Sequence, residues 1–319
     1  MATVAVIMRT KDRPLLLARA VADVCAQTFA DWHLVVVNDG GDVTAVDSVI
    51  GAHEAALGGR VTVIRNHVSQ GMEAASNQGI KASNSAYIAI HDDDDTWHPE
   101  FLTQTAAHLE SAADAAVAVR TELVWEHVDG DEIIEQGREV WAPDVRAFTL
   151  FDMLRYNRVI PISVLYRRAV HDEIGWYRED LPAVGDWEFW LRLAQTEHTL
   201  GFIDAEPLAF WRQRRGAQGA LANSVIARDA DHRAVDLLVR DEALRTFARQ
   251  YGVGDLLYLT KYIQLEADRV IGVVVQENRQ LVGRVARLEA AVSDASLVSL
   301  ARRRYRRLKA RLSSRTPSG

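Results

Sequence analysis

The sequence predicts an α/β fold: a mostly parallel sheet with helices on both faces, followed by a C-terminal helical region. Two observations predict the sheet. Short apolar runs at residues 4–8, 33–38 and 87–90 are continuous rather than alternating, which is typical of strands buried on both faces. Between them lie segments whose apolar residues recur at helical spacing, so strands and helices alternate as in βα units.

The elements follow one another in a regular order along the first hundred residues. We expect strands at 4–8, 33–38, 60–65 and 87–90, and helices at 14–27, 43–57, 73–82 and from about residue 100. Proline is tolerated in the first turn of the 14–27 helix, and Gly58-Gly59 ends the 43–57 helix. Right-handed crossovers between the strands then restrict the topology strongly.

Composition places limits on the protein's environment. The 319 residues are 48% apolar and contain one cysteine, Cys25, which excludes an intrachain disulfide framework and fits a reducing compartment. Residues 2–8 have the pattern of a strand rather than of a signal peptide, and no apolar run approaches the length of a membrane span. We therefore expect a cytoplasmic protein, free or peripheral on the cytoplasmic face of the membrane.

Charge is unevenly distributed. The net charge is −7, yet residues 301–319 carry seven arginines and one lysine with no acid, so the other 300 residues sum to −15. An acidic body argues against nucleic acid as the partner of the main domain. The basic tail is a separate element.

Four consecutive aspartates, Asp92 to Asp95, come directly after the strand at 87–90. Like charges this close repel one another, and a hard divalent cation such as Mg²⁺ or Mn²⁺ relieves that repulsion while leaving positions for substrate phosphates. The carboxyl end of a strand is where ligands bind in open α/β sheets. The alternative is a solvated acidic turn.

Five segments resemble a known family when they are read together. They are Val4 to Pro14, Gln27-Thr28-Phe29 with Trp32, Val37 to Asp42, Asn77 to Ile80, and the aspartate block with Trp97-His98-Pro99. In this order and spacing they resemble the inverting GT-A glycosyltransferases of family 2, over roughly residues 3 to 215. The resemblance implies the GT-A fold, a Rossmann-like nucleotide-binding sheet.

The resemblance also implies a donor site. The family's DxD motif falls on Asp92-Asp93-Asp94, so Asp94, with Asp92, would bind Mn²⁺ or Mg²⁺, and Asp92 or Asp93 would lie near the ribose. Arg9, Thr10 and Lys11 would border the nucleotide. Asp39 would accept a hydrogen bond from a pyrimidine ring, which favours a UDP- or dTDP-sugar.

Two residues depart from the pattern: Ser76 replaces an arginine found in many members, and His91 replaces an apolar residue.

The segment Leu181 to Leu193 resembles the family's acceptor-side signature, in which an acidic residue opens an aromatic-rich helix. On that alignment Asp186 is the catalytic base that takes the proton of the acceptor hydroxyl. The alternative for Asp186 is a helix N-cap, with Glu188 as the reserve base. Trp187 and Trp190 fit either a sugar platform or the core. Arg212 to Gly216 resembles a mobile loop that faces the diphosphate, although a solvated basic loop fits as well.

The resemblance implies transfer of a sugar to a hydroxyl of a glycan or lipid-linked acceptor, as in bacterial surface polysaccharide assembly. Two other classes stay open: a non-catalytic sugar-nucleotide or glycan binder on the same fold, and a phosphatase that uses Asp92 to Thr96 as a DxDxT motif. An EF-hand calcium loop fails because its glycine and terminal glutamate spacings are absent.

Three regions are expected along the chain. Residues 1–225 form the glycosyltransferase-like domain, with a donor half at about 1–112 and an acceptor half at about 113–225. Residues 226–300 form a helical extension in which 271–295 can be written as heptads, predicting a homodimeric coiled coil or a helix packed on its own domain. Residues 301–319 form a basic tail that either contacts an anionic membrane or is solvated.

Overall fold

The computed structural model describes residues 2–223, 229–295 and 297–313. The chain divides into two compact units, of which the first ends at Glu242 and the second begins at Ala243. The first unit extends beyond the boundary expected at residue 225, because Val235 and Val239 of helix α10 are buried in its core.

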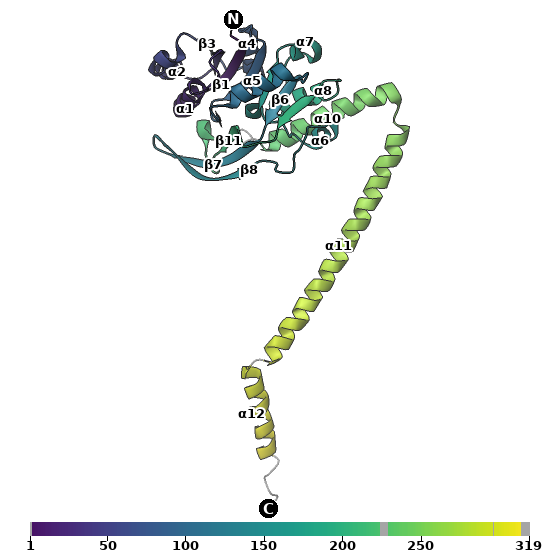
Figure 1. Ribbon diagram of the computed structural model, residues 1–319. Helices are drawn as coiled ribbons and strands as arrows, with labels where there is room; N and C mark the ends of the chain where they lie inside the picture. The colour runs from purple at the N-terminus through teal and green to yellow at the C-terminus, as the bar shows by residue number, and fades with distance from the viewer. Residues whose placement is uncertain (1, 224–228, 296, 314–319) are drawn as a thin grey trace, which may run out of the picture. The chain divides into compact units, whose positions relative to one another are not determined.

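A seven-stranded sheet forms the centre of the first unit, with the strand order β10-β6-β9-β4-β1-β2-β3 (Figure 1). Strand β1 is parallel to both β2 and β4, while β9 is antiparallel to its neighbours β4 and β6. The mostly parallel sheet is therefore confirmed. Its strands are β1 Val4–Thr10, β2 Trp32–Asp39, β3 Val61–Asn66, β4 Tyr87–Asp92, β6 Ala116–Val119, β9 Val164–Arg167 and β10 Leu200–Ile203.

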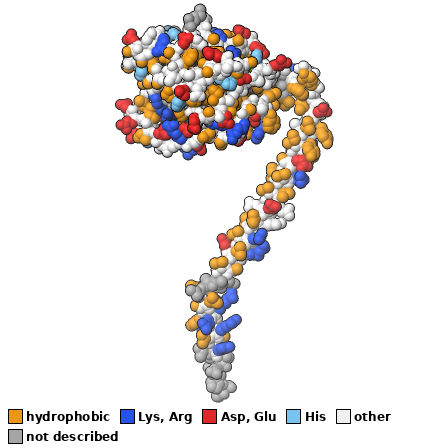
Figure 2. All heavy atoms as spheres, viewed as in Figure 1, with side chains coloured by type: hydrophobic (Ala, Val, Ile, Leu, Met, Phe, Trp, Pro, Cys, Tyr) orange, Lys and Arg blue, Asp and Glu red, His pale blue; other side chains and the backbone are white. Residues whose placement is uncertain are grey.

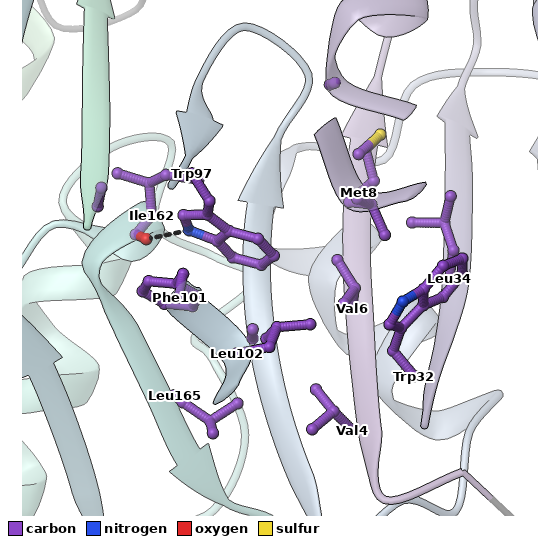
Figure 3. Close-up of a cluster of buried hydrophobic side chains, with 14 of the residues drawn as sticks. Val4, Val6, Met8, Trp32, Leu34, Trp97, Phe101, Leu102, Ile162 and Leu165 are labelled. Carbon is purple, nitrogen blue, oxygen red and sulfur yellow. Dashed lines mark hydrogen bonds between the residues drawn. The ribbon is translucent and has the colours of Figure 1, made fainter. Parts of the chain in front are cut away.

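The core has two parts, one on each face of this sheet. In β1, Val4, Val6 and Met8 point into one part, and Ala5 and Ile7 point into the other. Figure 3 shows the first part, where β1 and β2 residues lie opposite Trp97, Phe101 and Leu102. A strand buried on both faces needs apolar residues at every position, which is why the sequence runs were continuous.

The helices of this unit cover both faces, and all are short except α10, which continues past Glu242 into the second unit. They are α1 Pro14–Cys25, α2 Val43–Ala52, α3 Glu54–Leu57, α4 Met72–Lys81, α5 Phe101–Ser111, α6 Leu150–Arg155, α7 Val170–Ile174, α8 Gly185–Leu193 and α10 Asp229–Tyr251, with 3₁₀ turns at Pro161–Ser163 and Gly219–Leu221. The single helix expected at 43–57 is divided at His53 into α2 and α3.

A second sheet of four strands has the order β5-β11-β7-β8. Its strands are β5 Thr96–Trp97, β7 Thr121–Asp129, β8 Glu132–Val140 and β11 Ala209–Gln213. Strand β5 follows the aspartate block directly and pairs with β11. This pairing brings the basic segment after Trp211 alongside the aspartates, although more than a hundred residues separate the two in sequence.

The described part of the second unit is helical, as expected, and contains α11 Gly254–Ala295 and α12 Leu297–Ser313. Helix α11 is continuous across the heptad region despite Gly272 and Gly283. Its heptad residues Ile271, Val285 and Leu288 are all more than half exposed. The homodimer through 271–295 stays a prediction.

Candidate active site

The topology brings several polar groups to one edge of the main sheet. From β1 the chain proceeds to β2 and β3 on one side, whereas β4 lies on the other side of β1. This reversal of strand order is the position at which open α/β sheets bind ligands. Because β1, β2 and β4 are parallel, Arg9, Asp39 and Asp92 all lie at that carboxyl edge.

Arg9 joins strand β1 to the aspartate block. Its Nε donates to Asp92 Oδ1 at 2.9 Å, and its Nη2 donates to the same oxygen. Its Nη1 donates to Ser76 Oγ at 3.2 Å and lies 4.0 Å from Glu73 Oε2. The guanidinium of Arg9 therefore lies beside the position where many family members carry an arginine and this chain carries Ser76.

Asp94 is held by side chains from distant parts of the chain. Its Oδ2 accepts hydrogen bonds from Arg214 at 2.5 Å, Asn223 at 3.1 Å and Arg13 at 3.3 Å. Arg13 also donates to Asp93 Oδ1 at 3.1 Å. Sequence reasoning selected Arg9, Thr10 and Lys11 from this segment and missed Arg13, although charge complementarity with the aspartate block was a signal for it.

The neighbouring aspartates are buried. Burial, with the charge of Asp94 adding to it, raises the pKa of Asp93 to about 7 even though Arg13 opposes the shift. Burial and the adjacent carboxylates also raise the pKa of Asp95, whose Oδ1 accepts a hydrogen bond from the backbone N–H of Arg212 at 2.7 Å. This environment contradicts the alternative of a solvated acidic turn.

Glu126 of β7 gathers three arginines. It accepts hydrogen bonds from Arg19 at 2.8 Å, Arg214 at 2.7 Å and Arg212 at 3.1 Å. Burial raises the pKa of Glu126, but these guanidinium groups outweigh burial and hold its pKa below the usual value. Arg212 and Arg214 are therefore part of a buried network rather than of a solvated basic loop. The position of Glu126 depends on the pairing of β7 with β11, and no local sequence motif predicts that pairing.

Asp39 holds the loop at residues 66–71. Its two oxygens accept hydrogen bonds from Asn66 Nδ2, Ser69 Oγ, and the backbone N–H groups of Gln70 and Gly71, at 2.6 to 3.0 Å. Burial raises the pKa of Asp39, but the four donors outweigh it and lower the pKa overall. In this arrangement a pyrimidine would have to share the carboxylate with these donors.

The other two residues of the first-strand segment differ in exposure. Thr10 ends β1 and is buried, whereas Lys11 is exposed. His91 is fully buried, where a polar side chain requires partners. Its Nδ1 lies 2.9 Å from the carbonyl oxygen of Asp92, and its Nε2 lies 3.2 Å from Asp23 Oδ2. His91 thus connects helix α1 to the backbone of the aspartate block.

Asp186 lies in the first turn of α8, and the cap position is occupied by Val184. The helix N-cap alternative for Asp186 is therefore wrong. Its Oδ2 accepts a hydrogen bond from Asn157 Nδ2 at 2.7 Å. Burial raises the pKa of Asp186; Arg9 opposes that shift electrostatically and Asp92 adds to it, so Asp186 belongs to the same electrostatic site.

The other acceptor-side candidates have structural partners. Glu188 forms a two-pronged ion pair with Arg192, with both hydrogen bonds at 2.9 Å. Trp187 and Trp190 are buried in the core, and Trp187 Nε1 donates to the carbonyl oxygen of Met153 at 2.7 Å. The core alternative is correct for both tryptophans.

Glu73 is a buried carboxyl group that sequence reasoning missed. It lies in the first turn of α4, and its Oε1 would be 2.5 Å from a Cβ atom placed on Gly185. Burial raises the pKa of Glu73 to about 8, and Asp186 and Asp92 contribute in the same direction. Glu73 is therefore mostly neutral at pH 7, and it connects the donor-side helix α4 to the start of α8.

The residues fit a divalent ion only when the ion is shared with a ligand. Within the described ranges, no three or more His, Cys, Asp or Glu side chains converge as a metal site. Asp93 Oδ2 is buried without a hydrogen-bond partner there, and the described donors to the Asp94 carboxylate all reach Oδ2. Mg²⁺ in nucleotide sites takes one or two carboxylates and completes its coordination with phosphates and water, which these aspartates permit.

Comparison with known proteins identifies the family. Residues 5–175 match the family model described as Glycosyl transferase family 2. The chain belongs to glycosyl transferase family 2. The match covers the aspartate block, which argues against the phosphatase alternative, as does the presence of three strands before β4, the strand that ends in the block.

Individual relatives agree with this assignment. An uncharacterized glycosyltransferase of Bacillus subtilis, YwdF, is 26% identical over 197 residues, or 60% of this chain and 68% of YwdF. The Escherichia coli protein WcaA, named as a putative colanic acid biosynthesis glycosyl transferase, is 29% identical over 121 residues, or 38% of this chain and 43% of WcaA.

A solved structure shows the same fold. S. aureus TarS in complex with UDP-GlcNAc has a TM-score of 0.56 and 16% identity, and the match covers 69% of this chain and 61% of that one. The match supports a GT-A-like fold for this chain, a mostly parallel sheet with flanking helices. Among the described residues, no helix is long and apolar enough to cross a membrane.

Proposed function

We propose that this family 2 protein is an inverting, metal-dependent hexosyltransferase. It moves a sugar from a UDP- or dTDP-sugar to a hydroxyl of a glycan or lipid-linked acceptor, in the assembly of a bacterial surface polysaccharide. The observation that carries the proposal is the position of Arg9, which hydrogen-bonds to Asp92 of the aspartate block and also acts electrostatically on Asp186, although the two aspartates lie about a hundred positions apart in sequence.

The donor half would bind the nucleotide. Asp94, with Asp92, would hold Mn²⁺ or Mg²⁺ together with the diphosphate, and the ion supplies charge neutralisation of the leaving group. Arg9 and Thr10 would border the nucleotide from the end of β1, with Lys11 just beyond. Asp93 or Asp92 would lie near the ribose, and Asp39 near the base.

Arg13 and Arg214 add positive charge beside Asp94, where charge develops on a departing diphosphate.

The acceptor half would carry the base. The acceptor oxygen attacks the anomeric carbon as the bond from that carbon to the diphosphate oxygen breaks, and the nucleoside diphosphate leaves with the electron pair. The hydroxyl proton passes to Asp186. A carboxylate with a raised pKa is a stronger base than an exposed aspartate, so burial of Asp186 suits this role. A single displacement of this kind inverts the anomeric centre.

The names of the relatives support the biological setting. Besides WcaA, the relatives include proteins named for O-antigen and for succinoglycan biosynthesis. The TarS complex with UDP-GlcNAc supports a uridine nucleotide as the donor.

A non-catalytic sugar-nucleotide or glycan binder is the second candidate, since binding alone requires only the donor half. The test is to incubate the protein with a panel of nucleotide sugars and Mn²⁺, and to measure release of nucleoside diphosphate with and without a mixed glycan acceptor. Transfer or slow hydrolysis of one donor supports the enzyme. Binding of a donor without any release over many hours supports the binder.

A further inference from the structure

Helix α12 in the second unit combines a high density of basic residues with an apolar face. It carries six arginines and one lysine without a single acid. It also carries apolar side chains at Val298, Ala301, Tyr305 and Leu308, separated by three, four and three residues. At 3.6 residues per turn this spacing places the four side chains on one face of the helix.

This apolar face, Val298-Ala301-Tyr305-Leu308, is open to solvent within the described chain. Val298 is 62% exposed, Tyr305 68% and Leu308 57%. Basic residues border the face on both sides, with Arg302, Arg306 and Lys309 along one flank and Arg304 along the other. Figure 2 shows the blue side chains gathered on α12 next to orange ones. Long basic side chains can lie along an apolar surface while their charged ends stay in water.

Three kinds of partner could cover such a helix, and they differ in whether they contact its basic residues, its apolar face or both. A second copy of α12 would bring seven positive charges against seven. A nucleic acid would neutralise the charge but leave Tyr305 and Leu308 in water. An anionic lipid surface uses both features, because lipid phosphates meet the basic flanks while the apolar face enters the boundary between headgroups and acyl chains.

We propose that α12 is a membrane-interface helix that lies in the plane of an anionic bilayer, with Val298, Ala301, Tyr305 and Leu308 facing the acyl chains. This mode of attachment differs from purely electrostatic docking of a basic tail. Electrostatic docking disappears at high salt, whereas an inserted apolar face retains part of its affinity. The proposal concerns attachment alone and does not depend on which sugar donor the first unit uses.

The experiment is sedimentation of the full-length protein with vesicles of phosphatidylcholine containing one third phosphatidylglycerol. The test variant is Tyr305→Gln with Leu308→Gln, which keeps every charge. Leu300→Gln is the matched control, because Leu300 is 54% exposed on the same helix but lies off the apolar face. Glutamine has a good helix propensity, and far-ultraviolet circular dichroism verifies that helicity is retained.

We expect the wild type and Leu300→Gln to bind at low salt and to keep measurable binding in 0.5 M NaCl. The double variant should bind at least about tenfold more weakly at low salt and not at all at high salt. Equal binding by all three proteins at both salt concentrations would overturn the proposal, as would failure of the wild type to sediment.

A second arm addresses nucleic acid directly, using a labelled 30-base-pair DNA duplex and an RNA hairpin. Tighter binding to either than to the vesicles, unaffected by Tyr305→Gln with Leu308→Gln, would also overturn the proposal. Weak, salt-sensitive binding to both nucleic acids is the expected result.

Discussion

The side-chain amide of Asn157 donates a 2.7 Å hydrogen bond to Oδ2 of Asp186, while the carbonyl oxygen of the same amide accepts one from the backbone N–H of Val159 at 2.9 Å. The second bond fixes which end of the amide faces Asp186. Asn157 therefore holds one oxygen of the proposed base in place from a segment outside α8.

This arrangement predicts the effect of two substitutions. Asn157→Asp keeps the acceptor for Val159 but replaces the donor with a repelling carboxylate, whereas Asn157→Ala removes both bonds. We expect turnover to fall at least about tenfold in both variants, because Asp186 loses the donor that orients it and, in Asn157→Asp, also faces a like charge. Donor affinity should be unchanged, since neither substitution alters the aspartate block. Steady-state kinetics would show the loss of turnover, and nucleotide titration would show the unchanged donor affinity. Wild-type turnover in Asn157→Asp, with loss only in Asn157→Ala, would mean that the Val159 contact alone matters.

Asp186 itself should separate binding from chemistry. Asp186→Asn should preserve donor affinity and lower turnover by about two to four orders of magnitude, the range for loss of a general base. Glu188→Gln is the matched control, since it lies in the same helix turn but pairs with Arg192. Turnover of Asp186→Asn within a few-fold of wild type, or a larger loss in Glu188→Gln, would exclude Asp186 as the base.

Because Arg9 and Ser76 are in contact, an arginine at position 76 should replace part of the positive charge that is lost when Arg9 is removed. Arg9→Ala should weaken donor binding about 10- to 100-fold, because it removes a charged hydrogen-bonding group next to Asp92. Adding Ser76→Arg should restore part of the affinity, since residue 76 faces the same space. Arg65→Ala, on an exposed pair with Asp47 at the end of β3, serves as the control. A double variant that binds no better than Arg9→Ala would contradict this prediction.

Glu73 predicts an unusual pH dependence of stability. A carboxyl group whose pKa is raised on folding keeps its proton in the native state while the unfolded chain loses it, so stability falls as pH rises from the unfolded value of 4.5 toward about 8. The shift limits this loss to about 5 kcal/mol. Glu73→Gln should therefore gain stability relative to wild type between pH 5 and pH 9 in denaturant titrations. A difference between the two proteins that does not change with pH would contradict the raised pKa.

The sequence predicted the sheet well because each of its first four strands is locally encoded. The continuous apolar runs, the helical spacing between them and the strand-terminal polar residues all lie within short windows. The same windows placed Asp92, Asp94 and Arg9 at one edge, since parallel strands end together.

The rest of the site depends on long-range pairing. Glu126 and Arg214 meet because β11 pairs with β5 and β7, and Glu73 becomes buried only when α8 packs against α4. Neither contact can be predicted from the residues next to it in sequence. From the sequence alone, a charged residue at these positions would be expected to face solvent. The tryptophans of α8 show a second limit. A tryptophan that stacks on a sugar and a tryptophan buried in the core look the same in the sequence.

The central claim is that the aspartate edge binds a nucleoside diphosphate, and thermal stabilisation by UDP, dTDP and GDP with Mn²⁺ tests it most directly. Asp94→Asn is compared with Glu126→Gln, because both remove a carboxylate from the buried Arg214 but only Asp94 belongs to the proposed site. A ligand at 100 times its Kd adds about 2.7 kcal/mol of stability, or several degrees in Tm. We predict that UDP or dTDP raises the Tm of the wild type and of Glu126→Gln but not of Asp94→Asn. Equal stabilisation of Asp94→Asn, or no stabilisation of the wild type by any of the three nucleotides, would contradict the claim.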